Sequence, residues 1–453
     1  MSRLAKVSVL VLSWNGRRHL EECLPALEEQ RLPGRELEIL VLDNGSHDGT
    51  VAWLEKHHPR VRTLASRSNL GFCAGNNKLA QESRGDALVL LNNDTRPQAG
   101  WLEALVGALE AAPADVAAVS GKIVDWQGER LDFARGLMTF DGHAFQQGYR
   151  RPLPGLELPP AGSELLFACG GNMIVRRESF FEAGAFDADY FAYLEDVDLG
   201  WRLWAGGERV IFEPAAAVHH RSMATSQLLG NENRGFLFER NAFLTAYKNF
   251  DQEHWQKLMP LVLTTLIHRT QTLLVQNNPG GGLITLDPYA GLIANTAWPE
   301  SALAVAAAQA AAAAAAPSYP KTSLAEKWRG YGTRELMKRG VRKALRALLP
   351  AFVFADPADP QAGWPRITDP RTLAQLRAIS FIVGHLGAAA GKRRGLLARR
   401  RRGDAEIFAR FPLAVVPTYP GDETLFASAA FAEAWPADVP RADLALADIM
   451  DLG

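Results

Sequence analysis

The chain has 453 residues, too many for one compact hydrophobic core, so we expect two or three domains. Apolar residues make up 47% and charged residues 22%, which excludes a largely disordered chain, and the net charge of −1 hides a basic C-terminal third. Three cysteines without paired or metal-ligand spacing favour a reducing, cytoplasmic compartment, and no signal peptide is expected at 1–6.

Buried strands alternate with amphipathic helices in the first hundred residues. Continuous apolar runs predict four strands: 7–12, 37–42, 61–65 and 87–91. Helical spacing predicts three helices between them: about 19–30, where Pro25 can kink the chain, about 50–57, and from the end of the loop 69–75 to about Glu82. Repeated βα units predict a Rossmann-like, mostly parallel sheet with helices on both faces.

Mixed sheet and loops are predicted from 116 to 222. Short apolar runs predict strands over 173–175, 210–212 and 218–220. The acidic run 195–198 is expected to open a helix, because carboxylates are favoured at helix N-termini.

The C-terminal half is predicted to be mainly helical. An alanine-rich segment, 304–316, is ended by prolines and indicates a flexible or semi-helical linker. Nine Lys or Arg against two acids over 321–346, and a second basic block over 392–402, concentrate positive charge here. The apolar stretch 258–267 is too short to predict a membrane span, and the alanine-rich segment is too weakly hydrophobic.

Three of the predicted strands end in polar side chains: Ser13-Trp14-Asn15, Asp43-Asn44 and Asn92-Asn93-Asp94. The carboxyl ends of parallel strands meet at one edge, where open α/β sheets bind ligands. Asp43 can accept a hydrogen bond from a base imide or a ribose hydroxyl, and oxygen ligands near Asp94 suit a divalent ion that holds a phosphate. Each strand end alone is explained by an ordinary turn, but three at one edge favour a nucleotide site.

Six segments resemble family 2 glycosyltransferases of the GT-A fold, in the rhamnosyltransferase-like branch: 7–15, 41–50, 69–77, 90–95, 193–202 and 214–220. Each motif alone is weak, but six in the same order over about the first 250 residues are specific. The resemblance implies a GT-A domain followed by a mainly helical region. We expect four parts: the GT-A catalytic domain (1–250), a helical extension (251–300), an Ala/Pro-rich linker (301–320) and a basic helical region (321–453).

The resemblance also implies roles for single residues. Nucleotide binding is implied at nine positions: Ser13, Asn15, Asp43, Asn44, Asp48, Asn69, Gly71, Asn76 and Asn93. A divalent metal, Mg²⁺ or Mn²⁺, is implied at Asp94, His220 and Asn92, where Asn92 supplies an amide at a position that is often acidic in relatives. Asp196 is the implied general base for an inverting displacement, while the metal stabilises the leaving diphosphate.

Some of these residues have structural explanations that stay open. Acids at the start of a helix are favoured by its dipole, so the role of Glu195 beside the acceptor or donor sugar is open. Asp198 lies four residues before Arg202 and is expected to form a structural helix pair. Trp201 and Trp204, three residues apart, are expected in the core.

The adjacent histidines and the adjacent glycines also have both a structural and a functional explanation. His219 and His220 end a strand, where neighbours alternate, so one faces the site; the resemblance favours His220 as the ligand and leaves His219 in the vicinity of the sugar. Gly170 and Gly171 form either a hairpin turn or a place where the acceptor or diphosphate approaches the backbone closely.

The predicted function is that of a cytoplasmic, metal-dependent, inverting glycosyltransferase. We expect a nucleotide-sugar donor, of the dTDP-rhamnose or UDP-hexose type, and a lipid-linked or glycan acceptor in cell-wall or polysaccharide biosynthesis. Basic residues interleaved with apolar ones suit an anionic membrane surface, so peripheral binding to the inner face of the plasma membrane is expected; a solvated helix face is the alternative. Nucleic acid is not expected, because no aromatic interleaving or known module accompanies the basic blocks.

Two other functions are alternatives: a sugar nucleotidyltransferase and a non-catalytic binding scaffold. A sugar nucleotidyltransferase should have a glycine-rich loop after its first strand, and the segment 13–18 lacks repeated glycines. A non-catalytic scaffold that binds glycan or nucleotide at a decayed site is kept open by Asn92, although Asp94, Asp196 and His220 argue against it. The sequence predicts no oligomeric state.

Overall fold

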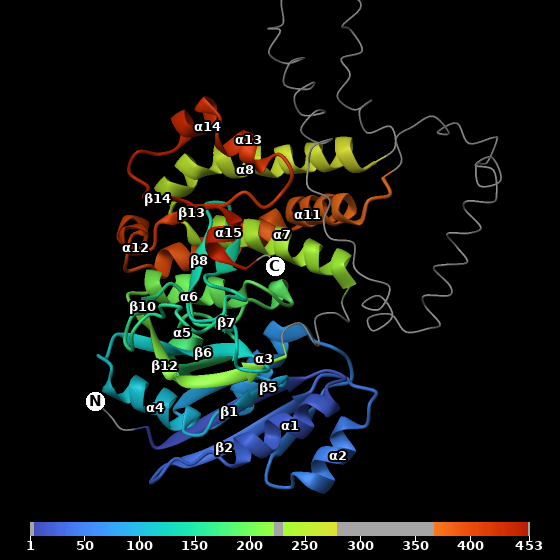
Figure 1. Cartoon of the computed structure of the whole chain (residues 1–453), viewed down its shortest axis with the longest axis vertical. Coiled ribbons are helices and arrows are strands. Elements are labelled where there is room, and N and C mark those ends of the chain that lie inside the picture. Colours follow the sequence, from blue (N-terminus) through green and yellow to red (C-terminus); the bar gives the residue numbers. More distant parts are fainter. Residues whose placement is uncertain (1–3, 222–229, 279–366, 452–453) are drawn as a thin grey trace, which may run out of the picture. The chain divides into compact units, whose positions relative to one another are not determined.

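The computed structural model describes residues 4–221, 230–278 and 367–451, which are coloured in Figure 1. The predicted alanine-rich linker and the first basic block lie outside the described residues. The described residues comprise the sheet, the helices that cover it and the C-terminal segment.

Contacts divide the chain into two compact units, and the first unit contains the sheet. It comprises Met1–Thr270 together with Leu373–Gly453, and the second unit is Gln271–Thr372. The sequence assigned the whole of 321–453 to one separate region, whereas its last part, from Leu373 onward, belongs to the same unit as the sheet.

The centre of the sheet is the predicted set of parallel strands. These are β1 (Lys6–Ser13), β2 (Glu36–Asp43), β3 (Arg62–Ala65) and β4 (Ala87–Asn92), in the spatial order β4-β1-β2-β3. In the register, Ser13 pairs with Asp43 and Leu12 with Asn92. The polar ends of three strands therefore lie at one edge, as predicted.

The rest of this ten-stranded sheet is mixed. Its strands are β5 (Thr95–Pro97), β6 (Val116–Asp125), β7 (Leu131–Phe133), β10 (Glu164–Leu165), β11 (Asn172–Arg176) and β12 (Arg209–His220). β11 pairs antiparallel with β4 and β6, and β12 runs parallel to β6. The two strands predicted over 210–212 and 218–220 are one strand, which continues through a register shift between Glu213 and Ala217.

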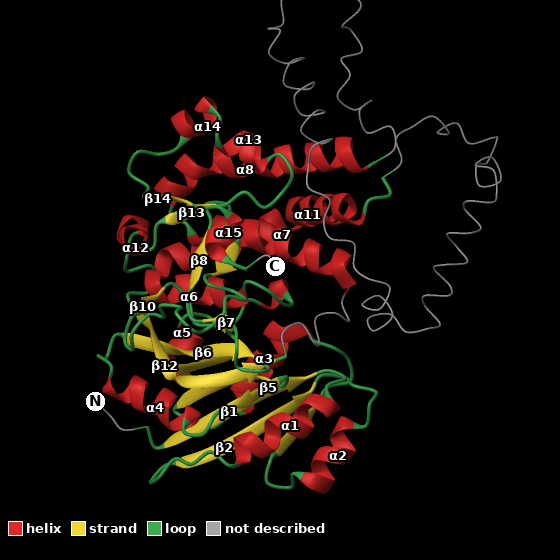
Figure 2. Cartoon of the chain, in the orientation of Figure 1, coloured by secondary structure: helices red, strands yellow, loops and turns green. Residues whose placement is uncertain are grey.

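Helices flank the strands (Figure 2). They are α1 (Arg17–Glu28), α2 (Thr50–His57), α3 (Gly71–Glu82), α4 (Trp101–Ala111), α5 (Arg177–Glu182) and α6 (Glu195–Ala205), with a short 3-10 turn, η1, over Ala188–Tyr190. α1 continues through Pro25. α3 starts at Gly71, inside the predicted loop, because Asn69 and the carbonyl of Phe191 accept hydrogen bonds from its first amides.

The C-terminal segment packs against helices that follow the sheet. The elements are α7 (Gly230–Asn249), α8 (Gln252–Asn277), α11 (Pro370–Arg399), α12 (Asp404–Arg410), β13 (Leu413–Val415), α13 (Asp422–Phe426), α14 (Ala429–Ala434), β14 (Arg441–Asp443) and α15 (Leu446–Ile449), with the hairpin β8 (Gly136–Met138) and β9 (Ala144–Gln146) nearby. The ring of Phe408 lies 5.6 Å from that of Trp201 on α6, and Phe140 meets the rings of Phe426 and Phe431. The C-terminal segment thus completes the core of the unit that contains the sheet.

A buried ionic cluster joins the same parts. Arg269 on α8 lies 2.7 Å from an oxygen of Asp141 and 3.0 Å from one of Asp422, and it is only 4% exposed. His143 lies 3.1 Å from Glu239 on α7. Burial opposes a charge on His143, but the carboxylates of Asp141 and Glu239 raise its pKa to about 10. The cluster therefore fixes α7 to the hairpin and to the C-terminal segment.

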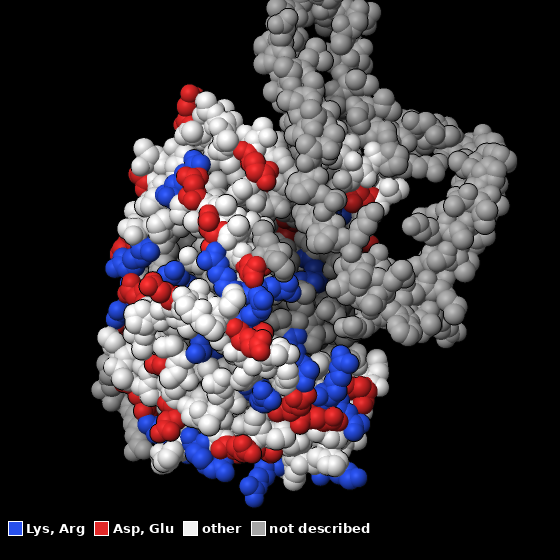
Figure 3. Space-filling view, viewed as in Figure 1, with Lys and Arg blue, Asp and Glu red and all other residues white. Residues whose placement is uncertain are grey.

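Two helices among the described residues are long and apolar enough to cross a membrane, judged by length and composition alone: Gln252–Asn277 and Pro370–Arg399. The predicted apolar stretch 258–267 proves to be part of the first, which has 26 residues. Ile267 is 62% exposed and Val383 is 71% exposed. Lys and Arg are interspersed with Asp and Glu on the face of the molecule seen in Figure 3.

Candidate active site

The loops that follow β1 and β4 contact each other at the carboxyl edge of the sheet. The Asn93 Nδ2 atom donates to Ser13 Oγ at 3.0 Å, and the Asn15 amide donates to Ser46 Oγ at 2.8 Å. A Cβ at Gly16 would lie 2.2 Å from Asn93 Nδ2, so glycine is needed there for the close approach. The structure thus brings Ser13, Asn15 and Asn93 together as predicted.

Asp43 presents a buried acceptor at this edge. The residue is 5% exposed, and its Oδ2 atom accepts from the Ser46 amide at 3.3 Å. Its Oδ1 atom has no hydrogen-bond partner among the described residues. A buried acceptor without a partner is costly, so this oxygen is suited to a donor group on a ligand.

Asn44 and Asn69 hold the loop that leads into α3. Asn44 Oδ1 accepts from the Leu70 amide at 2.9 Å, and its Nδ2 donates to Asn69 Oδ1 at 3.0 Å. Asn69 Oδ1 also accepts from the Gly71 amide at 2.8 Å. Gly71 has a φ of 82°, which a side chain would disfavour. These residues shape the edge through the backbone.

Asp48 and Asn76 also bond to the protein itself. Asp48 accepts from the amides of Arg17 (3.0 Å) and Thr50 (3.2 Å), which fixes the starts of α1 and α2. Burial opposes its ionisation, but these hydrogen bonds lower the pKa of Asp48. Asn76 Nδ2 donates to the carbonyl of Phe72 at 3.0 Å, within α3.

Asp94 and His220 face each other, and Asp132 lies behind the histidine. Asp94 Oδ1 is 3.3 Å from His220 Nε2, and Asp132 Oδ2 is 2.8 Å from His220 Nδ1. Both carboxylates are buried. Burial opposes a charge on His220, but the two carboxylates raise its pKa to about 10. Sequence reasoning missed Asp132, because it follows a loop without any pattern and meets His220 across 88 residues.

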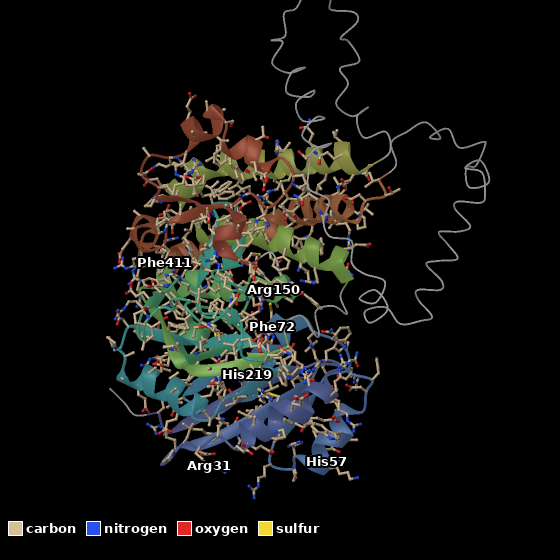
Figure 4. The ribbon with its side chains drawn as sticks, viewed as in Figure 1. Arg31, His57, Phe72, Arg150, His219 and Phe411 are labelled. Carbon is tan, nitrogen blue, oxygen red and sulfur yellow. The ribbon has the colours of Figure 1, made fainter. Side chains whose placement is uncertain are left out.

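His219 points the other way along β12. Its Nε2 atom lies 3.1 Å from Gln98 Nε2, and a Cβ at Gly128 would come within 2.8 Å of its ring (Figure 4). The alternation of the two histidines is therefore as predicted. The structure does not bring His219 to Asp94.

Two glycines separate the strand ends from α6. A Cβ at Gly171 would lie 2.9 Å from Asn92 Nδ2, so the amide of Asn92 packs over bare backbone. The neighbouring amide of Gly170 donates to Asp196 Oδ2 at 3.1 Å. Gly170 and Gly171 thus connect β11, the Asn92 side chain and the predicted base.

Asp196 and Glu195 form a close pair of carboxyl groups at the start of α6. Burial of its carboxyl group raises the pKa of Asp196, although the amides of Gly170 and Val197 oppose the shift. Burial and the charge of Asp196 raise the pKa of Glu195 well above its usual range. Glu195 Oε2 is buried without a hydrogen-bond partner among the described residues. Two adjacent acids with different proton affinities suit proton transfer.

The turn before α6 is strained. Phe191 has φ 62° and ψ −59°, and the amide of Ala192 donates to the carbonyl of Tyr190 at 2.7 Å, which closes a γ-turn of the rare type. Tyr193 and Leu194 follow with φ values of 72° and 63°. Such conformations cost about 1–3 kcal/mol each and persist where the surroundings hold them. Asp196 therefore lies two residues after the last of these strained backbone conformations, Leu194.

The third acid of the segment 195–198 is held by contacts within the protein. Asp198 is fully buried, 2.8 Å from Arg202 and 3.1 Å from Lys248. Trp201 and Trp204 are fully buried too, as predicted. This part of α6 anchors the helix to the core.

A sheet that gathers a carboxylate, an imidazole and a second carboxylate at its carboxyl edge has the arrangement of an α/β protein that binds a ligand there. The family model "Glycosyl transferase family 2" matches residues 8–182. The N-acetylglucosaminyl-diphospho-decaprenol L-rhamnosyltransferase of Mycobacterium tuberculosis (strain CDC 1551 / Oshkosh) is 31% identical over 244 residues, 48% of this chain and 77% of that protein. The chain belongs to glycosyltransferase family 2, is of the rhamnosyltransferase-like type and has the GT-A fold.

Two further similarities are weaker. The O-antigen biosynthesis protein RfbC of Myxococcus xanthus is 32% identical over 205 residues, 43% of this chain and 16% of that protein. Among solved structures, the mannosyltransferase PcManGT from Pyrobaculum calidifontis, in complex with GDP-Man and Mn²⁺, is 19% identical, with 85% of this chain and 88% of that chain covered and a TM-score of 0.42. A similarity at this score carries no argument about activity.

Proposed function

We propose that this glycosyltransferase is an inverting enzyme that moves a sugar from a dTDP-rhamnose- or UDP-hexose-type donor onto a lipid-linked or cell-surface glycan acceptor. The observation that carries the proposal is the approach of Asp94 to His220, at 3.3 Å, on the edge that also bears the unpaired Asp43 oxygen. The similar rhamnosyltransferase is named for a lipid-linked acceptor, N-acetylglucosaminyl-diphospho-decaprenol. That name supports the choice of acceptor class.

A divalent metal, Mg²⁺ or Mn²⁺, fits the Asp94–His220 pair if it displaces the proton that Asp94 and Asp132 hold on His220, because only the neutral imidazole is a ligand. Imidazole and carboxylate ligands of one ion lie about 2.1 Å from it and hence about 3 Å from each other, close to the 3.3 Å observed. An imidazole beside a carboxylate favours Mn²⁺ over Mg²⁺. Asn92 stays a predicted third ligand. The ion, when bound, would stabilise the charge that builds up on the leaving diphosphate.

The chain's own residues supply the other parts of the reaction. Asp43 would accept a hydrogen bond from the base or the ribose of the donor. Asp196 would take the proton of the acceptor hydroxyl, whose oxygen then attacks the anomeric carbon from the face opposite to the departing nucleoside diphosphate. A base must be ionised to do this, and the amides that donate to Asp196 favour the ionised form.

A membrane surface is the proposed place of action. Val383 and Leu386 on α11 are exposed and apolar, and Arg394 and Arg399 lie further along the same helix. Deletion of the C-terminal region is a poor test, because its last part shares the core with the sheet. The double substitution Val383→Asp with Leu386→Asp is expected to reduce pelleting with anionic liposomes. Equal pelleting of variant and wild type would contradict this surface.

The function is tested by a thermal-shift panel of nucleotide sugars, with and without Mn²⁺ or Mg²⁺. We expect stabilisation by one donor and a further shift with the metal. The responding donor is then incubated with a short-chain analogue of N-acetylglucosaminyl-diphospho-decaprenol, and release of the nucleoside diphosphate is followed. Binding without transfer would favour the alternative of a non-catalytic scaffold. No response to any nucleotide sugar would refute the proposal.

A further inference from the structure

The turn from Tyr190 to Leu194 connects the nucleotide side of the site to the base. The carbonyl of Phe191 accepts from the amides of Phe72 (2.6 Å) and Cys73 (3.1 Å) in the first turn of α3. At its other end the turn runs through Leu194 into α6, two residues before Asp196. The path of this turn therefore sets where Asp196 stands relative to α3.

Two neighbouring side chains of α7 bond to the turn: Arg240 donates to the carbonyls of Asp189 (2.6 Å) and Tyr190 (2.9 Å) at its start, and Asn241 bonds along its length. Asn241 Nδ2 lies within hydrogen-bond distance of three carbonyls, those of Tyr190 (3.1 Å), Ala192 (2.9 Å) and Tyr193 (2.8 Å). Its Oδ1 atom accepts from Arg240 Nε at 3.0 Å, and this contact fixes which end of the amide faces the turn. Asn241 is fully buried, so water cannot replace it.

The two helices that meet the turn differ in their other supports. The start of α3 has its own bonds, because Asn44 and Asn69 accept from the amides of Leu70 and Gly71. The start of α6 has no hydrogen bond from the side chain of its first flanking residue, Leu194, which is itself in the left-handed region. Loss of the Asn241 amide would therefore loosen the turn and the first residues of α6 more than α3, while Asp198 keeps the rest of α6 in the core.

We propose that Asn241 is a positioning residue for sugar transfer, which holds the strained turn so that the carboxylate of Asp196 reaches the acceptor hydroxyl. It acts through the backbone of the turn and touches neither substrate. The inference rests on the proposed function of Asp196 as the base. A purely structural role for Asn241 predicts a less stable protein with unchanged catalysis once folded, and this difference can be measured.

The experiment compares Asn241→Ala with Asn249→Ala in the full chain. Asn249 is a matched control: it lies on the same helix, is equally buried, and donates to Asp198 at 2.9 Å instead of to the turn. Three quantities are measured: hydrogen exchange of peptides that cover 190–194, the affinity for dTDP-rhamnose with Mn²⁺, and kcat with the short-chain acceptor analogue. If Asn241→Ala does not fold, Asn241→Ser, which keeps one donor, replaces it.

We expect faster exchange at 190–194 in Asn241→Ala, donor affinity within about twofold of the wild type, and kcat lower by about 10- to 100-fold, the cost of a small misplacement. Asn249→Ala should lose stability but keep kcat within about threefold. Unchanged exchange at the turn, or an unchanged kcat, would overturn the inference. If wild type itself transfers no sugar, the proposed function fails instead, and hydrogen exchange at 190–194 still decides whether Asn241 holds the turn.

Discussion

The proposed donor side and the proposed acceptor side of the site are built in different ways. On the donor side, Ser13 and Asp43 pair at the ends of β1 and β2, and Asp94 lies two residues after the end of the neighbouring strand β4. On the acceptor side, Asp196 follows a strained turn that α7 holds by side-chain bonds to the backbone. α7 in turn is fixed by His143 and the C-terminal segment. The first side is a property of the sheet, and the second depends on contacts between distant segments.

The largest effect on the rate of transfer is expected when Asp196, the proposed general base, is replaced. Asp196→Asn keeps the size and the hydrogen-bonding shape of the side chain but removes its ability to take a proton. Loss of a general base costs about 10²- to 10⁴-fold in rate, so kcat should fall in that range while donor affinity is retained. Initial rates and calorimetric donor binding measure the two quantities.

The control is Asp189→Asn, which changes an exposed acid of the same segment that pairs with Lys392. Its kcat should stay close to that of the wild type. A fully active Asp196→Asn would show that Asp196 is not the general base. The proposed difference between the two sides of the site would then be wrong.

The second prediction tests the buried ionic cluster that holds α7, the helix that supports the acceptor side. Arg269→Met leaves Asp141 and Asp422 buried without their shared cation. Breaking a buried ion pair from one side costs about 3–5 kcal/mol, so the free energy of unfolding in urea should fall by this amount. Lys257→Met on the same helix removes an exposed pair with Glu253 and should cost less than about 1 kcal/mol. Equal losses in the two variants would show that the cluster does not fix α7.

The third prediction concerns the donor side. Asp132 accepts from or pairs with His220 Nδ1 and would orient the imidazole toward Asp94. Such outer partners of a ligand change metal affinity by about 10- to 100-fold, so Asp132→Asn should weaken Mn²⁺ binding by that factor in a titration followed by electron paramagnetic resonance. Gln98→Ala, which removes the neighbour of His219 on the opposite side, should leave Mn²⁺ affinity unchanged. Equal affinity in Asp132→Asn and wild type would argue against the orientation.

The sequence predicts the donor side better than the acceptor side for a physical reason. Strand ends are local features, so Asp43 and Asp94 are visible as polar residues after apolar runs. Asp132 and Asn241 are defined by contacts across 88 and about 50 residues, and no local pattern marks them. An amide that holds a loop, such as Asn44, also looks the same in sequence as one that binds a ligand.

The errors in the fold have a similar origin. Two separate strands are predicted over 210–212 and 218–220, but β12 continues through a register shift between Glu213 and Ala217 as one strand. The segment 69–75 is predicted as a loop, whereas α3 starts at Gly71, where the carbonyl of Phe191 accepts from the amides of Phe72 and Cys73. In both places a long-range hydrogen bond or pairing overrides a local preference.

The smallest effect is expected at Glu195, and it separates the two carboxyl groups of the acceptor side. The general base works when ionised, so the rate should fall as the pH drops through the pKa of Asp196, which burial places above the usual value for aspartate, about 3.9. Burial and the charge of Asp196 raise the pKa of Glu195 well above its usual range, so we predict that Glu195 keeps its proton while Asp196 titrates.

Glu195→Gln therefore replaces one neutral group by another. The acid limb of the kcat profile should move by less than about 0.3 pH units, because no charge next to Asp196 has changed. If Glu195 were ionised in this range, its removal would relieve repulsion and move the limb to lower pH by about one unit or more. A pH–rate profile of the two proteins decides between these outcomes. A large shift would mean that the two carboxyl groups share their charge, so that the base of the acceptor side is the pair and not Asp196 alone.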